Sequence, residues 1–321
     1  MRRPPQARML PDGRRLHLQD GPIDLVIAAF GATSNVRAAY EAAIARFTGL
    51  LDELCEELVE LRRPADPDAT VLHGTVALRM HGAVAPHAAD TFITPMAAVA
   101  GTVAETVLAA MTQAAALDRA YVNNGGDIAL HLAPGARFVV GLADHPAPGQ
   151  HGGRVLAGTA EIVSGQGVGG IATSGRHGRS FSLGIADAVT VLAASAAGAD
   201  AAATVIANAV DLPGHPAVAR LPAREIQPDS DLGDRLVTRD VAPLSPRDVA
   251  MALAPGEAMA ARLLARGLIA GAALRLQGET RLIGVAATDH APLLPVAGGE
   301  SEFVQIIRNA HTMQQKSPAH A

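Results

Sequence analysis

The spacing of apolar residues along the chain predicts strands and helices in irregular alternation. Apolar side chains that alternate with polar ones, or short runs rich in β-branched residues, are typical of strands. Such patterns occupy residues 15–18, 23–30, 71–80, 119–122, 128–132, 138–142, 155–163, 171–174, 187–193, 269–276 and 280–287. Apolar side chains that recur every three or four positions predict helices instead. These occupy residues 35–61, 96–117, 197–210 and 246–266.

Capping and turn residues mark the expected limits of several elements. Ser34 and Ser245 are favourable N-caps, and Pro246 suits the first position of the last helix. Turn-forming residues at 19–22 and 277–279 predict two β-hairpins. These signals fix where the chain reverses.

The connections predict an α+β fold of antiparallel sheets packed with helices. Residues 128–132 and 138–142 are expected to pair with each other, whereas the charged, proline-rich residues 211–240 predict an exposed excursion. Two small-residue helices, each near strands and a glycine-rich turn, indicate an internal duplication. We therefore expect a single domain over residues 1–290, for which two intertwined halves are an alternative description, and a polar C-terminal tail at residues 291–321.

Composition excludes several classes of protein. Apolar residues make up 49% of the 321 residues and charged residues 18%, as in a globular protein. The net charge of −5, with no Trp, 2 Tyr and 6 Phe, argues against binding of nucleic acid. The single cysteine, Cys55, excludes an internal disulfide and cysteine-based zinc or iron–sulfur sites, and its neighbours predict a packed helix position. The single lysine, Lys316, argues against a Schiff base or a Walker-type phosphate loop.

The most apolar segments predict a soluble, cytoplasmic protein with no membrane partner. The N-terminal residues contain Arg2 and Arg3 and lack the apolar stretch of a signal peptide. The most apolar stretch, residues 185–210, contains Asp187 and Asp200. No uninterrupted run is therefore expected to span a membrane.

A glycine-rich turn is the first candidate site. It consists of Asn123, Asn124, Gly125, Gly126 and Asp127. Paired glycines permit positive φ angles and let a ligand approach the backbone, where the amides and the carboxylate could contact it. The same residues also favour an ordinary hairpin turn, so both interpretations stay open.

A second candidate is the small polar segment Thr173, Ser174 and Gly175 at the end of a strand. Its hydroxyl groups could hydrogen-bond a phosphate or a ribose, although an ordinary turn can have the same composition. Just upstream, residues 165–170 match G-x-G-x-x-G. A dinucleotide-binding fingerprint needs a helix after its glycines. Since a strand is expected there, we reject that interpretation.

A third candidate is a line of polar side chains on the helix expected at residues 197–210. Asp200, Thr204 and Asn208 share one face of a helix that is otherwise Ala, Val and Ile. A carboxylate buried among such neighbours is costly unless it is paired or bound to a metal. Because Mg²⁺ prefers carboxylate and hydroxyl oxygens, Asp200 and Thr204 are candidate metal ligands. A solvent-facing stripe is the alternative.

Taken in order, four segments resemble the ApbE superfamily, known for flavin transferases that attach FMN to protein threonines. The segments are residues 94–101, 122–128, 172–175 and 186–204. They look closest to the small, uncharacterised cytosolic branch of the superfamily. The resemblance implies antiparallel sheets with helices, built by duplication, and a site for FAD or FMN.

The resemblance also implies roles for the candidate residues. Residues 123–127 and 173–175 would line the flavin site, and Asp200 and Thr204 would bind Mg²⁺ beside the pyrophosphate. Two elements of the flavin transferases are missing: the Lys-Gly step of the first small-residue helix and the H-I-x-D-P-x-T-G block. Ordinary flavin transfer is therefore not expected.

We expect an ApbE-like protein that binds a flavin nucleotide or another phosphorylated small molecule, with Mg²⁺ as the candidate metal. One alternative is a true FAD:protein FMN transferase with altered catalytic groups. Another is a non-catalytic assembly partner in sulfur or homocysteine metabolism. The Ala-rich surface of such a protein could support a homodimer. The sequence leaves catalysis itself open.

Overall fold

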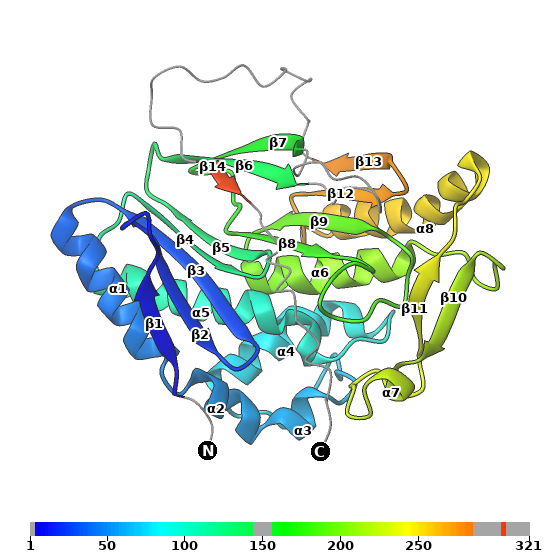
Figure 1. Ribbon diagram of the computed structural model, residues 1–321, viewed down its shortest axis with the longest axis horizontal. Helices are drawn as coiled ribbons and strands as arrows, with labels where there is room; N and C mark the ends of the chain where they lie inside the picture. The colour runs from blue at the N-terminus through cyan, green and yellow to red at the C-terminus, as the bar shows by residue number, and fades with distance from the viewer. Residues whose placement is uncertain (1–3, 144–155, 285–302, 306–321) are drawn as a thin grey trace, which may run out of the picture.

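The computed structural model describes residues 4–143, 156–284 and 303–305 of the chain. Helices cover one face of a nine-stranded sheet, and a three-stranded sheet lies against its other face (Figure 1). A separate two-stranded sheet lies at one end of the molecule. The expected α+β class, with antiparallel sheets packed against helices, is confirmed.

The nine-stranded sheet has the order β1-β2-β3-β4-β5-β8-β9-β12-β13, and all its neighbouring strands are antiparallel. Its strands are β1 (Gln6–Met9), β2 (Leu16–Asp20), β3 (Ile23–Phe30), β4 (Arg119–Asn124), β5 (Asp127–Leu132), β8 (Gly170–Ser174), β9 (Ala188–Ala193), β12 (Gly271–Leu276) and β13 (Glu279–Gly284). The smaller sheets contain β6 (Arg137–Ala143), β7 (Leu156–Val163) and β14 (Phe303–Gln305), and β10 (Val218–Pro222) with β11 (Leu236–Val241).

The helices lie between the strands in sequence, and most of them pack on one side of the large sheet, whereas α7 lies beside β10 (Figure 1). They are α1 (Thr33–Phe47), α2 (Leu50–Glu56), α3 (Leu58–Leu61), α4 (Thr75–Ala88), the 3₁₀ turn η1 (Pro95–Ala98), α5 (Val99–Ala114), α6 (Ala196–Ala209), α7 (Ala223–Ile226) and α8 (Pro246–Ala265). Ser245 caps α8 as expected, because its side chain accepts the N–H of Asp248.

The two halves of the large sheet repeat one connectivity. Each half has four antiparallel strands in sequence order, β2-β3-β4-β5 and β8-β9-β12-β13, and the helices are inserted between the second and third strands. In this repeat α6 follows β9 as α1 follows β3, and α8 precedes β12 as α5 precedes β4. The small-residue helices α5 and α6 therefore do not occupy equivalent positions in the repeat. They pack against each other in the middle of the molecule.

Two sequence predictions in the first half are wrong. Residues 71–80 were expected to form a strand, but α4 begins at Thr75, and Val76, Met80 and Val84 bury one face at helical spacing. The long helix expected at residues 35–61 is divided into α1, α2 and α3, because Gly49 at φ +83° turns the chain between the first two.

Local details of these helices also differ from expectation. Helix α1 begins at Thr33 after Ala32, so Ser34 lies inside the helix and is not its cap. Cys55 on α2 is exposed, although its apolar neighbours predicted a packed position. The short helix buries Leu50 and Leu54 instead, and these two face the core.

The predicted pairing of residues 128–132 with 138–142 is also wrong. Both segments are strands, but β5 pairs with β4 and β8, whereas β6 pairs with β7 and β14 in the smaller sheet. Apolar side chains between the two sheets explain this arrangement, since Tyr121 and Phe138 meet edge to face with ring centroids 6.1 Å apart. The tertiary contact between sheets decides the partner of β6.

The excursion and the tail contain short strands. Residues 211–240 include β10, α7 and β11, and Phe303–Gln305 of the predicted tail pairs in parallel with β6. Within the described residues, the stretch Pro95–Ala114 alone is long and apolar enough to span a membrane. More than half of it is buried inside the protein, as in a core helix.

Helices α5 and α6 cross in close contact at Gly101. A β-carbon at Gly101 would overlap the carbonyl of Ala196, and it would lie 2.9 Å from the backbone nitrogen of Ala197. Each helix also caps the other. The carboxylate of Asp200 on α6 accepts the N–H of Gly101 at 3.0 Å, and that of Glu105 on α5 accepts the N–H of Ala197 at 3.3 Å.

We predict that Gly101→Ala lowers the free energy of unfolding by about 2–3 kcal/mol or more, because backbone and not a flexible side chain occupies the required space. Urea unfolding followed by circular dichroism measures the change. Gly82→Ala is the matched control on α4, where no atom lies within 4 Å of the added methyl group. This control should raise stability by about 0.5–1 kcal/mol. Equal effects of the two substitutions would contradict the close crossing.

Candidate functional site

The glycine-rich turn connects β4 to β5 near the middle of the large sheet. Asn124 pairs with Asp127 across the turn, and Gly125 and Gly126 have φ angles of +69° and +118°. The side chain of Asn123 accepts the N–H of Gly126 at 2.9 Å and stabilises the turn. The predicted positive φ angles are confirmed, and the turn is a tight hairpin as the second interpretation expected.

Asn124 joins this turn to the first turn of α5. Its Nδ2 donates to the carbonyl of Ala100 at 3.2 Å, which fixes the orientation of the amide. Its Oδ1 is buried and has no hydrogen-bond partner among the described residues. An unpaired buried carbonyl oxygen costs free energy, so Oδ1 is a candidate ligand for a hydrogen-bond donor or a cation.

The segment at the end of β8 is joined to the same turn. The N–H of Thr173 donates to Oδ1 of Asp127 at 3.2 Å, and the hydroxyl groups of Thr173 and Thr190 are 2.9 Å apart. Ser174 follows in the strand, partly buried. Gly175 has φ +142°, and a β-carbon there would lie 2.7 Å from the carbonyl oxygen of Asp187. The strand after Gly170 agrees with rejection of the dinucleotide fingerprint.

Asp200 brings α6 to this group of residues. Burial and the nearby charge of Asp127 raise the pKa of Asp200 well above its usual value. The backbone N–H groups of Gly101 and Ala100 and the positive charge of Arg179 act in the opposite direction. Two carboxylates close enough to influence each other form an acidic site at the N-terminus of α5.

The polar line on α6 divides into different environments. Thr204 is partly buried one turn beyond Asp200, and its hydroxyl group has no side-chain hydrogen bond among the described residues. Asn208 accepts the N–H of Leu183 at 2.9 Å, so it holds the loop between β8 and β9. Three predicted segments therefore converge around Asp127 and Asp200, whereas Asn208 has a structural role.

A metal ion at this point would have to be bound by oxygen atoms and not by histidine or cysteine side chains. Residues 4–143, 156–284 and 303–305 contain no group of three or more His, Cys, Asp or Glu side chains suited to a metal ion. The carboxylates of Asp127 and Asp200 and the unpaired amide oxygen of Asn124 are hard donors of the kind that Mg²⁺ prefers. Magnesium binding by Asp200 and Thr204 stays a prediction.

Sequence reasoning gave no role to the loop between β8 and β9, which contains two arginines beside the site. Arg176 forms an ion pair with Asp187 at 2.7 Å, and His177 lies 3.3 Å from the same carboxylate. Burial raises the pKa of Asp187, but hydrogen bonds from His177 and Gln277 and the charge of Arg176 produce a net lowering. Arg179 lies instead against Gly125.

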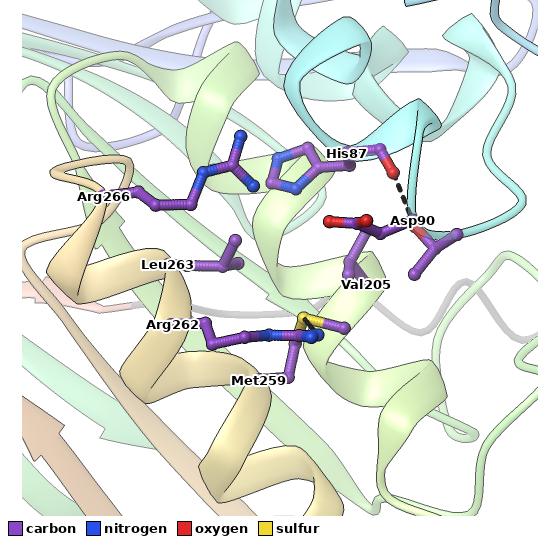
Figure 2. Close-up of a pocket in the computed structure, with 8 residues that line it drawn as sticks. His87, Asp90, Val205, Met259, Arg262, Leu263 and Arg266 are labelled. Carbon is purple, nitrogen blue, oxygen red and sulfur yellow. Dashed lines mark hydrogen bonds between the residues drawn. The ribbon is translucent and has the colours of Figure 1, made fainter.

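A small cavity lies away from this site, between the C-terminal part of α4 and helices α6 and α8 (Figure 2). Its volume is about 10 Å³, room for about one water molecule. The ring of His87 points toward the guanidinium of Arg266, and Arg262 and Asp90 also line the cavity (Figure 2). The size excludes a nucleotide, so the cavity is not the predicted ligand site.

The fold and the joined segments define the class of protein: an α+β protein with an acidic, glycine-rich site where the two halves of an antiparallel sheet meet. The chain belongs to the family described as AbpE bacteria, whose model matches residues 7–282. The link to the ApbE superfamily stays a prediction.

The relatives of the chain include proteins of methanogenic archaea named UPF0280 protein. That of Methanopyrus kandleri is 42% identical over 126 residues, which cover 38% of this chain and 45% of the relative. That of Methanosphaerula palustris is 39% identical over 150 residues, 46% of this chain and 56% of the relative. The matched region spans about half the length of these relatives.

Asp200→Asn is predicted to stabilise the protein in the absence of ligand. Burial and the charge of Asp127 disfavour the ionised carboxylate, whereas an amide oxygen can still accept the N–H of Gly101. A gain of about 0.5–2 kcal/mol is expected at pH 7. The pKa of Asp200 in the folded protein lies above the unfolded value of 3.8. The wild type therefore loses stability as pH rises from 3.8 toward the folded pKa, and the variant lacks this loss. Urea unfolding of both proteins across this pH range measures it. A less stable variant would contradict the prediction.

His87 is predicted to make the protein sensitive to acid. Burial and the charge of Arg266 lower the pKa of His87 to about 4, below the ordinary value of 6.5. The unfolded state therefore binds more protons between these values, and stability falls by up to about 3 kcal/mol as pH decreases from 6.5 to 4. His87→Gln should remove this part of the decrease in urea unfolding experiments. The control His73→Gln, at an exposed position, should retain the decrease that His87 causes.

Proposed function

We propose that the protein binds a phosphorylated small molecule together with a divalent cation at the site around Asp127 and Asp200. The observation that carries the proposal is the convergence of three sequence segments on two interacting carboxylates. The N–H of Thr173 donates a hydrogen bond to the carboxylate of Asp127, and the N–H of Gly101 donates one to the carboxylate of Asp200. A flavin nucleotide, FAD or FMN, is the specific candidate, because the same segments resemble the flavin site of the ApbE superfamily.

A cation would resolve two unfavourable features of the site. The carboxylates of Asp127 and Asp200 repel each other, which raises the pKa of Asp200 on top of the effect of its burial. Oδ1 of Asn124 is buried without a partner among the described residues. A hard cation favours all three oxygens as ligands, and Thr204 is a further candidate. The donor set thus suits Mg²⁺.

Some residues of the site would then bind the cation, and others would contact the ligand. Asp127, Asp200 and Asn124 would hold Mg²⁺, which when bound neutralises phosphate charge. Gly125 and Gly126 have no side chains, so a ligand or a neighbouring side chain can approach their backbone closely. No lysine lies within the described residues, so an amine nucleophile is not part of the proposal.

The reciprocal capping of α5 and α6 favours a second candidate, a non-catalytic protein that retains the site for structure. Asp200 accepts the N–H of Gly101, and this bond alone explains a carboxylate at the N-terminus of α5. Such a protein would bind neither nucleotide nor magnesium. The two candidates differ in one measurable property, the response to ligand and cation together.

We predict that FAD or FMN with Mg²⁺ raises the midpoint of thermal unfolding, and that either component alone has a smaller effect. A ligand at 100 times its dissociation constant adds about 2.7 kcal/mol to stability. Isothermal titration calorimetry with FAD, FMN, ATP and inorganic pyrophosphate, each with and without Mg²⁺, ranks the candidates. If none of these ligands binds, the result would support the second candidate, a non-catalytic protein that retains the site for structure.

Asp200→Asn tests the role of the carboxylate in the same experiment. The variant should lose the magnesium-dependent part of the thermal shift, even though its midpoint without ligand is higher than that of the wild type. Asp234→Asn is the matched control, because Asp234 is exposed in the connection between β10 and β11 and pairs with Arg224. A full magnesium-dependent shift in the Asp200 variant would exclude this carboxylate as a ligand.

A further inference from the structure

Arg179 lies at the rim of the proposed site, in the loop between β8 and β9. Its Nη1 donates to the carbonyl of Pro22 in the turn between β2 and β3, at 3.2 Å. Its Cζ lies 2.8 Å from the position that a β-carbon on Gly125 would take. The guanidinium therefore lies directly on the backbone of the glycine-rich turn, and only glycine leaves room for it there.

Within the part of the chain that the structure describes, no close ion pair neutralises the charge of Arg179. The neighbouring Arg176 is paired with Asp187 at 2.7 Å, whereas Arg179 has no carboxylate within 4.0 Å among the described residues. It is close enough to Asp200 to lower the pKa of that carboxyl. A guanidinium has five N–H donors, and the hydrogen bond to Pro22 uses one of them. The side chain is exposed, so the remaining donors are accessible to a ligand.

The site thus separates charge over a short distance. Asp127 and Asp200 supply negative charge at the N-terminus of α5, and Arg179 supplies positive charge across the turn at Gly125. A magnesium phosphate has the complementary arrangement, because the cation is attracted to carboxylates and phosphate oxygens are attracted to a guanidinium. A neutral ligand would not form charge–charge interactions with both the carboxylates and the guanidinium.

We propose that Arg179 binds the phosphate group of the ligand over Gly125, and that it thereby selects phosphorylated ligands from their unphosphorylated counterparts. This inference rests on the proposed function. The planar guanidinium can donate two parallel hydrogen bonds to a phosphate, which an ammonium group cannot. Gly125 takes part indirectly, since any side chain there would displace the guanidinium.

Titration calorimetry with matched ligands tests the inference. FMN and riboflavin differ by one phosphate group, and inorganic pyrophosphate with Mg²⁺ contains the phosphate chemistry alone. Arg179→Gln should weaken binding of FMN and pyrophosphate by about 10–100-fold, as expected for loss of charged hydrogen bonds, and leave riboflavin unchanged. Arg179→Lys should restore only part of the affinity. Arg37→Gln is the control, because Arg37 is exposed on α1 with 79% of its side chain accessible.

The outcomes separate this inference from the proposed function. If the wild type binds none of FMN, FAD and pyrophosphate, the proposed function fails and the role of Arg179 fails with it. If the wild type binds them and Arg179→Gln binds equally well, only the inference is overturned. An equal loss for riboflavin and FMN also overturns it, because that result indicates a structural role for the contact with Pro22. The unfolding midpoint of each variant without ligand shows whether the variant is folded.

Discussion

The contact between α5 and α6 is the constraint on which the rest of the structure depends. The two helices approach so closely at Gly101 that the position has no room for a side chain. Their N-termini are stabilised reciprocally, by Asp200 for α5 and by Glu105 for α6. Because α5 belongs to the first half of the sheet and α6 to the second, this crossing holds the halves together. It also brings the carboxylate of Asp200 to the turn between β4 and β5.

The same contact explains why the candidate site is unfavourable without a ligand. Asp200 is partly buried where it reaches the N-terminus of α5, and there it lies in the field of Asp127. Hydrogen bonds from backbone N–H groups offset part of this cost, and the charge of Arg179 offsets another part. Functional sites often retain such strain because it is relieved when the ligand binds. Stability and binding are therefore expected to oppose each other at Asp200.

The repeated connectivity gives the site its position between the halves. The turn with Gly125 and Gly126 comes from the first half, and Thr173, Arg179 and Asp200 come from the second. Neither half contains both carboxylates. The loop between β8 and β9 is anchored by the ion pair of Arg176 with Asp187, and this anchoring leaves Arg179 beside the turn. A ligand that contacts Asp127 and Asp200 together would connect the two halves of the sheet.

The sequence by itself determined the class of fold, most strands and helices, and the candidate residues at 123–127, 173–175 and 200, because these depend on local spacing and turn chemistry. The pair Gly125 and Gly126 has the positive φ angles that a tight turn needs, and Ser245 caps a helix through its own neighbours. The tertiary structure decided the partner of β6, the helical state of residues 75–80 and the position of Arg179. Each of these depends on contacts between residues far apart in the chain, such as Tyr121 with Phe138 or Arg179 with Gly125. No local pattern contains that information.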